Sequence, residues 1–154
     1  MEQFNVRVYG ILINEKKQVL VADEFIREKY YTKFPGGGLE FGEGTRDCLK
    51  REFIEEMNLQ VEVLEHLYTT DFFQESAFRP GDQILSIYYL VKALEPISVR
   101  LSEIEFDFDE EQLRRYEQSR EVETFRLIDW SDLSEESVSL PIDKVVVRSI
   151  KEKF

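Results

Sequence analysis

The sequence predicts a single α+β domain, and three observations lead to this prediction. The chain has 154 residues, enough for one domain with a substantial core and too few for two ordinary domains. Hydrophobic residues make up 42% of the chain and charged residues 34%, a balance typical of a folded globular protein. The expected elements run in the order strands, helix, strands, helices, which favours an α+β arrangement over a doubly wound one. We therefore expect residues 1–154 to form one domain.

The expected strands are segments in which apolar residues alternate or cluster between turn residues. The segments that meet this description are residues 4–12, 18–25, 59–73, 83–93 and 124–128. Residues 14–17 read as the turn of a hairpin between the first two of these strands. The stretch 95–123 is polar and very acidic. We expect it to be a variable excursion with a short helix over residues 110–118, shaping either a ligand pocket or a dimer contact.

The best-defined helix is expected over residues 46–57. Its largest apolar residues are spaced by four and form one buried stripe: Leu49, Phe53 and Met57. Thr45 is the expected N-cap of this helix, and Asn58 suits the left-handed position that follows a helix end. A second helix is expected to start at Pro141 and to run through Lys151.

The charge of the chain limits its partners. The formal net charge is −12 at pH 7, and such a surface repels nucleic-acid polymers and anionic membranes. A small phosphorylated ligand is compatible with this charge if metal ions or basic side chains make its site attractive. No apolar run approaches the roughly 20 residues of a membrane helix, and the first residues do not resemble a signal peptide. Cys48 is the only cysteine, which excludes an internal disulfide and favours a cytoplasmic location.

Three glutamates of the expected helix point to metal chemistry. Glu52, Glu55 and Glu56 occupy positions i, i+3 and i+4, so their carboxylates project from one side of the helix. Like charges at this spacing repel one another, and a hard divalent cation removes that conflict. An all-oxygen ligand set favours Mg²⁺ or Mn²⁺ over Zn²⁺. The alternative is a solvated acidic face, and the preceding glycines at 36–38 favour the metal site because bare backbone can present carbonyl oxygens to a cation.

The segment 37–59 resembles the signature of the Nudix family. That signature is a glycine, five residues, a glutamate, seven residues, Arg-Glu, an aliphatic residue, any residue, Glu-Glu, any residue, a glycine and an aliphatic residue. The residues that match it are Gly37, Glu43, Arg51, Glu52, Glu55, Glu56 and Leu59. Phe53 replaces an aliphatic residue, and Asn58 replaces the final glycine as the next best residue for a left-handed helix end. The resemblance implies a Nudix-type α/β/α sandwich with a mixed central sheet.

The resemblance also implies a mechanism, in which water attacks one phosphorus of a diphosphate with the help of one to three divalent ions. The metal ligands that it implies are the carboxylates of Glu52, Glu55 and Glu56 and the carbonyl oxygen of Gly37. Among these, Glu56 is expected to bridge the ions. Arg51 is expected to pair with Glu43 and to hold the loop against the helix, and a contact with phosphate is its alternative role.

The sequence offers several candidates for the general base and for the cations that bind phosphate. The base is either Glu52, inside the signature, or a glutamate of a late loop, for which Glu121 is the first candidate and Glu117 and Glu123 are its rivals. Four basic residues lie on or near the early strands: Arg7, Arg27, Lys29 and Lys33. They are candidates for binding substrate phosphates, and ordinary surface charge is the alternative for at least half of them.

The expected function is hydrolysis of a diphosphate linkage in a small nucleoside diphosphate derivative, with Mg²⁺ or Mn²⁺ as cofactor. One alternative is a catalytically silent Nudix fold that senses a ligand or binds a protein, but such proteins typically lose part of the glutamate set. A second is an unrelated acidic scaffold that matches the signature by chance. Nucleoside triphosphates, ADP-ribose, nucleotide sugars, dinucleoside polyphosphates and coenzyme-type diphosphates all remain candidate substrates. The oligomeric state is open, and a homodimer is plausible by family analogy alone.

Overall fold

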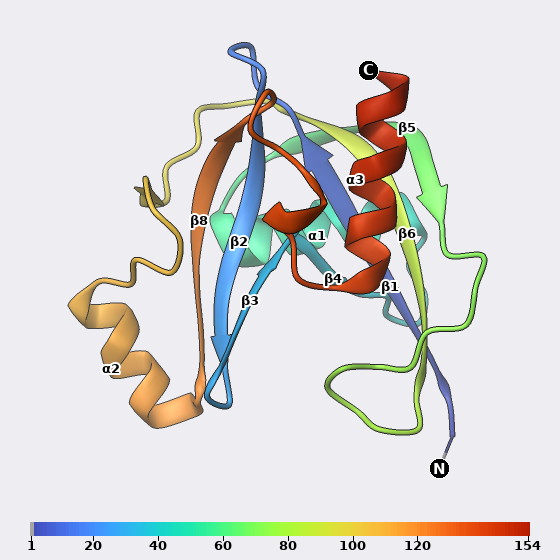
Figure 1. Cartoon of the computed structure of the whole chain (residues 1–154), viewed down its shortest axis with the longest axis horizontal. Coiled ribbons are helices and arrows are strands. Elements are labelled where there is room, and N and C mark those ends of the chain that lie inside the picture. Colours follow the sequence, from blue (N-terminus) through green and yellow to red (C-terminus); the bar gives the residue numbers. More distant parts are fainter. Residues whose placement is uncertain (1) are drawn as a thin grey trace. The chain divides into compact units, whose positions relative to one another are not determined.

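The computed structural model describes residues 2–154, and within them the chain forms eight strands and three α-helices (Figure 1). The strands are β1 (Phe4–Leu12), β2 (Gln18–Ile26), β3 (Lys29–Lys33), β4 (Gly36–Gly38), β5 (Val61–Thr69), β6 (Gln83–Ala93), β7 (Leu101–Ser102) and β8 (Glu121–Asp129). The helices are α1 (Thr45–Met57), α2 (Glu110–Ser119), α3 (Pro141–Lys153) and a single 3-10 turn, η1 (Glu135–Ser137). The predicted α+β class is confirmed, with the strands divided between two mixed sheets.

The chain divides into two compact units, each built on one of the four-stranded sheets. Unit 1 comprises the described residues up to Leu12 and residues 35–97, and unit 2 comprises residues 13–34 and 98–154. The sheet of unit 1 has the strand order β4-β1-β6-β5, and the sheet of unit 2 has the order β3-β2-β8-β7. Each sheet contains one parallel pair, β1 with β6 and β7 with β8, among antiparallel neighbours.

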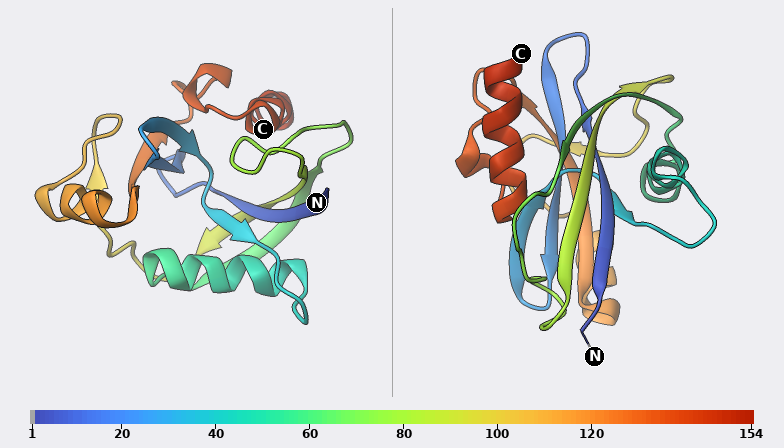
Figure 2. Two further views of the ribbon diagram at one scale, coloured as in Figure 1. Left: turned by 90° about the horizontal axis from the view of Figure 1, so that it is seen from below. Right: turned by 90° about the vertical axis from the view of Figure 1, so that its right-hand side faces the viewer.

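In unit 1, α1 lies along one face of the sheet and contacts β1, β4 and β5 (Figure 2). The predicted apolar stripe is confirmed, because Leu49, Phe53 and Met57 are each at most 1% exposed. The Phe53 ring packs so closely on β1 that a methyl group at Gly10 would lie 2.8 Å from it. Burial of large side chains at this spacing is what fixes the helix on the sheet.

The two ends of α1 are stabilised in different ways. Thr45 is not the N-cap, since the helix is capped by Gly44 and Thr45 is its first residue. The Thr45 hydroxyl is instead 2.7 Å from the hydroxyl of Tyr89 on β6, so its polar group ties the helix to the sheet. Asn58 has left-handed φ and ψ values of 50° and 42°, and its N–H donates to the Ile54 carbonyl at 2.9 Å. The predicted role of Asn58 is therefore confirmed.

The predicted hairpin between the first two strands is wrong. The turn is present, because the Asn14 side chain accepts hydrogen bonds from the N–H groups of Lys16 and Gln18. Among the described residues, the only pairing near this turn is a single bridge between Ile13 and Val19, and β1 and β2 are not paired with each other. β1 is paired on both sides by β4 and β6, and β2 by β3 and β8. Both edges of each strand are thus used within its own sheet.

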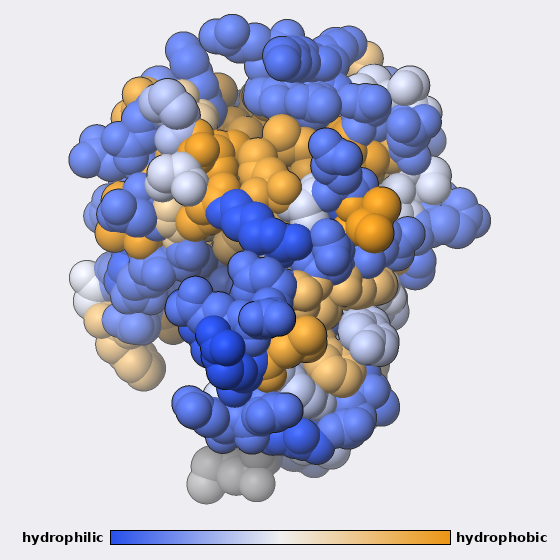
Figure 3. All heavy atoms as spheres, turned by 90° about the vertical axis from the view of Figure 1, so that its left-hand side faces the viewer, coloured by the Kyte–Doolittle hydropathy of each residue, from blue (hydrophilic) through white to orange (hydrophobic). Residues whose placement is uncertain are grey.

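The acidic stretch 95–123 is ordered and belongs mostly to unit 2. The short helix predicted over residues 110–118 is confirmed as α2, which starts with a capping box between Asp109 and Gln112. Arg100 fixes the preceding loop by donating to both the carbonyl and the carboxylate of Asp107, at 2.6 and 3.1 Å. Figure 3, which looks at the side where Figure 1 draws α2, shows hydrophobic surface broken up by hydrophilic side chains.

A buried ion pair anchors this stretch to the sheet of unit 2. Asp23 on β2 is fully buried, and it accepts two hydrogen bonds from Arg126 on β8, at 2.8 and 3.0 Å. The same carboxylate accepts from the Thr32 hydroxyl at 2.7 Å and from the Phe106 N–H at 3.2 Å. Such complete hydrogen bonding is the condition under which a buried charge is tolerated.

Helix α3 completes unit 2. Its apolar side chains Ile142, Val146 and Ile150 are buried, and Lys151 donates from Nζ to the Trp130 carbonyl at 2.6 Å. No helix within residues 2–154 combines the length and the apolar character that crossing a membrane requires.

Candidate active site

The glycine strand β4 is at the edge of the unit 1 sheet, directly before the loop that leads into α1. Gly36 has a φ of +150°, and a Cβ there would lie 2.7 Å from the Tyr9 Cα, so glycine is required for this strand to pair with β1. In the ladder, Gly37 faces Val8 and Gly38 faces Arg7. The pairing with β1 therefore holds the β4 backbone in place, and no side chain of β4 covers it.

Glu52 of α1 packs directly against this bare backbone. A Cβ at Gly37 would lie only 2.5 Å from Glu52 Oε2, and the other carboxylate atoms of Glu52 are equally close to that point. The Glu52 side chain is 12% exposed. Residues 37 and 52 are therefore brought together as the sequence predicts. The Glu52 carboxylate can take this position only because residue 37 has no side chain.

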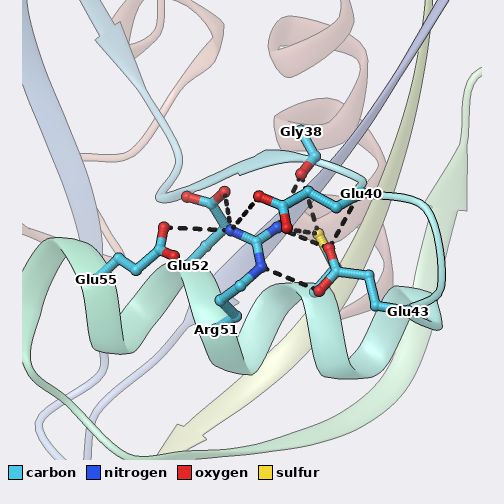
Figure 4. Close-up of polar contacts among 7 residues, drawn as sticks. Gly38, Glu40, Glu43, Arg51, Glu52 and Glu55 are labelled. Carbon is cyan, nitrogen blue, oxygen red and sulfur yellow. Dashed lines mark hydrogen bonds and ion pairs between the residues drawn. The ribbon is translucent and has the colours of Figure 1, made fainter.

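Arg51 lies at the centre of the acidic residues (Figure 4). Its Nε and Nη2 donate to the two carboxylate oxygens of Glu43, at 3.0 and 2.7 Å, in the bidentate geometry that suits a guanidinium. Its Nη1 is 2.9 Å from Glu52 and 3.2 Å from Glu55, and Nη2 also donates to the Gly38 carbonyl at 3.0 Å. One cation thus links the loop, the glycine strand and two turns of α1.

The electrostatic consequences of this cluster are clear at Glu43 and Cys48. The hydrogen bonds from Arg51 lower the pKa of Glu43 to about 2, and those same bonds raise the pKa of Arg51. Burial, and secondarily the neighbouring Glu43 carboxylate, raises the pKa of the Cys48 thiol to about 12. Arg51 and Glu43 therefore stay charged, and Cys48 stays protonated and unreactive.

The predicted residues divide into three groups by position. Gly37, Glu43, Arg51, Glu52 and Glu55 are brought together as described. Glu56 follows on the same helix. Glu121 is the first residue of β8 in unit 2 and is exposed, so its role as general base stays a prediction.

No group of three or more histidine, cysteine or acidic residues within residues 2–154 is arranged to hold a metal ion. Two of the predicted ligands, Glu52 and Glu55, instead contact Nη1 of Arg51, at 2.9 and 3.2 Å. The donor chemistry nevertheless fits a hard cation, because the facing groups are carboxylates and peptide carbonyls.

One member of the cluster was not predicted. Glu40 lies 3.6 Å from Arg51 Nη1. It falls in the five-residue spacer, where the signature specifies no residue type. The one sequence signal for Glu40 is its position three residues before Glu43, whose carboxylate accepts a hydrogen bond from the Glu40 N–H at 3.0 Å.

The four candidate phosphate-binding cations belong to different units of the chain. Lys33 forms an ion pair with Glu24 at 2.8 Å and is largely buried. Arg27 and Lys29 are at the tip of the β2-β3 hairpin in unit 2. Arg7 is in unit 1, paired with Gly38 in the sheet.

Comparisons with known proteins agree on one family. A family model described as the NUDIX domain matches residues 3–146. An RNA pyrophosphohydrolase of Ruthia magnifica subsp. Calyptogena magnifica is 35% identical over 69 residues, which are 45% of this chain and 37% of that protein. The match therefore spans little more than a third of that relative.

Solved structures resemble the whole chain. A MutT NUDIX hydrolase from Burkholderia pseudomallei has a TM-score of 0.68 and 16% identity, covering 96% of this chain and 98% of its own. A NUDIX hydrolase from Nitrosomonas europaea has a TM-score of 0.68 and 14% identity, covering 97% of this chain and 89% of its own. At these identities the similarity establishes the fold.

Proposed function

This chain belongs to the Nudix hydrolase family, and we propose that it hydrolyses a diphosphate linkage in a small nucleoside diphosphate derivative with Mg²⁺ as cofactor. The observation that carries the proposal is the contact between the Glu52 carboxylate and the bare backbone of Gly37. This contact brings together the first glycine of the signature and the glutamate of its Arg-Glu pair. Every charged position of the signature is also present, from Glu43 to Glu56.

The residues that would hold the metal are Glu52, Glu55 and Glu56, together with the carbonyl oxygen of Gly37. When bound, Mg²⁺ supplies charge neutralisation at the phosphate oxygens and lowers the pKa of a bound water. The protein itself contributes a rigid frame, because Arg51 fixes the loop to α1 through Glu43 and the Gly38 carbonyl. Glu52 is our first candidate for the base that takes a proton from water, and Glu121 is the second.

The relative from Ruthia magnifica is named for cleaving a pyrophosphate at RNA. We propose the same class of reaction for this chain, but we do not propose RNA as its substrate. The net charge of −12 works against a long polyanion and still permits a small phosphate ester held by metal and local cations. A triphosphorylated oligonucleotide nevertheless belongs in the substrate panel, since it tests this choice directly.

We further infer that the two units work as one Nudix domain. The family model covers residues 3–146 and so runs through both units. The chain also passes from one unit to the other three times, after residues 12, 34 and 97, which opposes independent folding. A cytoplasmic location and a homodimer remain expectations.

The experiment is hydrolysis of a panel of diphosphate compounds with Mg²⁺ or Mn²⁺, read by phosphate release after coupling to a phosphatase. Glu55→Gln and Glu56→Gln should each lose several orders of magnitude in kcat/KM while keeping their melting temperature. Glu62→Gln, an exposed glutamate on β5 outside the signature, is the matched control and should keep full activity. Full activity in both signature variants would refute the metal-site assignment.

The same panel separates an enzyme from a silent sensor. Turnover that requires the divalent ion and disappears in Glu56→Gln supports the enzyme and identifies its substrate class. A panel without turnover, in a protein whose melting temperature still rises with a nucleotide ligand, would favour the sensor.

A further inference from the structure

The guanidinium of Arg51 has two sides, and each side serves different partners. On one side, Nε and Nη2 donate to the Glu43 carboxylate, and Nη2 also donates to the Gly38 carbonyl. On the other side, Nη1 donates to both Glu52 and Glu55. These are five hydrogen bonds to oxygen, as many as the N–H groups of a guanidinium. Every N–H of this side chain is thus used within the cluster.

The two sides also differ in how firmly they are held. The contact with Glu43 is bidentate, and the Glu43 side chain is 17% exposed. Nη1 makes a single hydrogen bond to each of its two carboxylates. The Glu55 side chain is 57% exposed and lies one helical turn from Arg51, an arrangement in which an ion pair contributes little because water and salt screen it. The bonds of Nη1 are therefore more easily replaced than the bidentate contact, which keeps the guanidinium in place.

Nη1 contacts two of the three carboxylates that the proposed function assigns to the metal, those of Glu52 and Glu55. An ion bound by both would share these carboxylates with Nη1, and two cationic groups so close together repel each other. The effect is reciprocal, since a bound ion weakens the bonds of Nη1 and these bonds weaken the binding of the ion by the same factor. Figure 4 shows Glu43 and Glu55 on opposite sides of Arg51, so the bonds to Glu43 do not take part in this competition.

We propose that Arg51 is a positioning residue that competes with the divalent ion. Nη1 holds Glu52 and Glu55 until the ion binds, and it then releases them while Nε and Nη2 stay on Glu43. This inference rests on the proposed function, which supplies the metal ligands, and it adds a residue that sets the affinity of these ligands for the ion. Arg51 keeps the two carboxylates ordered in the metal-free protein and raises the concentration of ion that is needed to load the site.

The test is the Kd for Mn²⁺ alone, measured by titration calorimetry without substrate. Arg51→Gln by itself would leave Glu43 without its cation, so the informative variant combines Arg51→Gln with Glu43→Gln, which removes one charge of each sign. Its Kd should be about 10-fold lower than that of the parent protein, the change expected when a unit charge within a few ångströms of a divalent ion is removed. Glu43→Gln alone should raise Kd, because the guanidinium is then free to bind Glu52 and Glu55 more tightly.

Lys50→Gln is the matched control for charge. Lys50 precedes Arg51 in α1 and is exposed, so its replacement removes the same charge, leaves the bonds of Arg51 in place and should change Kd by less than about twofold. An unchanged or higher Kd in the double variant, with thermal unfolding showing that it is folded, would overturn the proposal. An equal decrease of Kd in Lys50→Gln would overturn it as well.

Arg51→Lys replaces the double variant if the latter does not fold. An ammonium lacks the planar fork and cannot bind Glu43 on one side and Glu52 and Glu55 on the other. Kd for Mn²⁺ should therefore decrease in Arg51→Lys too, by a smaller factor than in the double variant. An unchanged Kd in folded Arg51→Lys would overturn the proposal.

Glu55→Gln separates the failure of this inference from that of the proposed function. A Kd that rises in Glu55→Gln and is the same in parent and Arg51 variants would overturn the inference and keep the metal site. A Kd that ignores Glu55 would refute the metal ligands, and with them the inference. Mn²⁺ binding that depends on both residues, in a protein without turnover on the substrate panel, would support the inference and count against hydrolysis.

Discussion

The replacement Gly37→Ala is the sharpest test of how the glycine strand supports the site. Gly37 has no positive φ, so alanine imposes no strain on the backbone itself. Its methyl group would stand 2.5 Å from Glu52 Oε2, whereas an ordinary contact begins near 3.4 Å. The Glu52 carboxylate must therefore move by roughly 1 Å, and a displacement of that size in a catalytic group costs about 100-fold in rate. We expect kcat/KM to fall by about that factor, equivalent to ~2.7 kcal/mol in transition-state stabilisation.

The assay is steady-state hydrolysis of the best substrate from the panel, with Gly38→Ala as the matched control. A methyl at Gly38 would make only an ordinary contact, 3.6 Å from Arg7 Nη1, so this variant should stay within a few-fold of the parent. Circular dichroism should show that both variants are folded. Parental activity in Gly37→Ala, alongside an inactive Glu52→Gln, would refute the reasoning, because Glu52 would then act from a different position.

Two further predictions follow from the cluster around Arg51. The pKa of Glu43 is depressed from 4.5 to about 2 in the folded protein, so its stabilisation is complete above pH 4.5 and is lost as the pH falls toward 2. The melting temperature of Glu43→Gln should therefore depend less on pH in that window, and a parallel decline of both proteins would contradict the assignment. The pKa of Cys48 is raised to about 12 by burial, so iodoacetamide at pH 8 should alkylate the native thiol far more slowly than the thiol of urea-unfolded protein, whereas equal rates would show that the thiol is accessible.

Features that depend on neighbouring residues were predictable from the sequence. The stripe of Leu49, Phe53 and Met57 and the left-handed Asn58 both follow from the local geometry of one helix. The pairing of Arg51 with Glu43 followed from the spacing of the signature and occurs as expected. In each case the physical cause lies within a few turns of chain.

Features that depend on distant residues were not predictable. The hairpin between β1 and β2 was wrong because β1 finds both of its partners elsewhere, one of them β6, more than 70 residues away in the sequence. Asp23 and Arg126 are 103 residues apart, and neither has a local pattern that marks it as buried. The position of Arg7 beside Gly38 likewise follows only from strand register, which a single sequence does not specify.

The position of Arg51 has a consequence for the order of assembly of the protein. A helix that carries Glu52, Glu55 and Glu56 on one side would resist folding in the absence of an external cation. Here the cation is supplied by the adjacent residue of the same helix, and it already contacts two of those carboxylates. The helix can therefore form without a divalent ion to balance these charges. If Mg²⁺ binds these carboxylates as proposed, it would replace one counter-ion by another in a scaffold that is already folded.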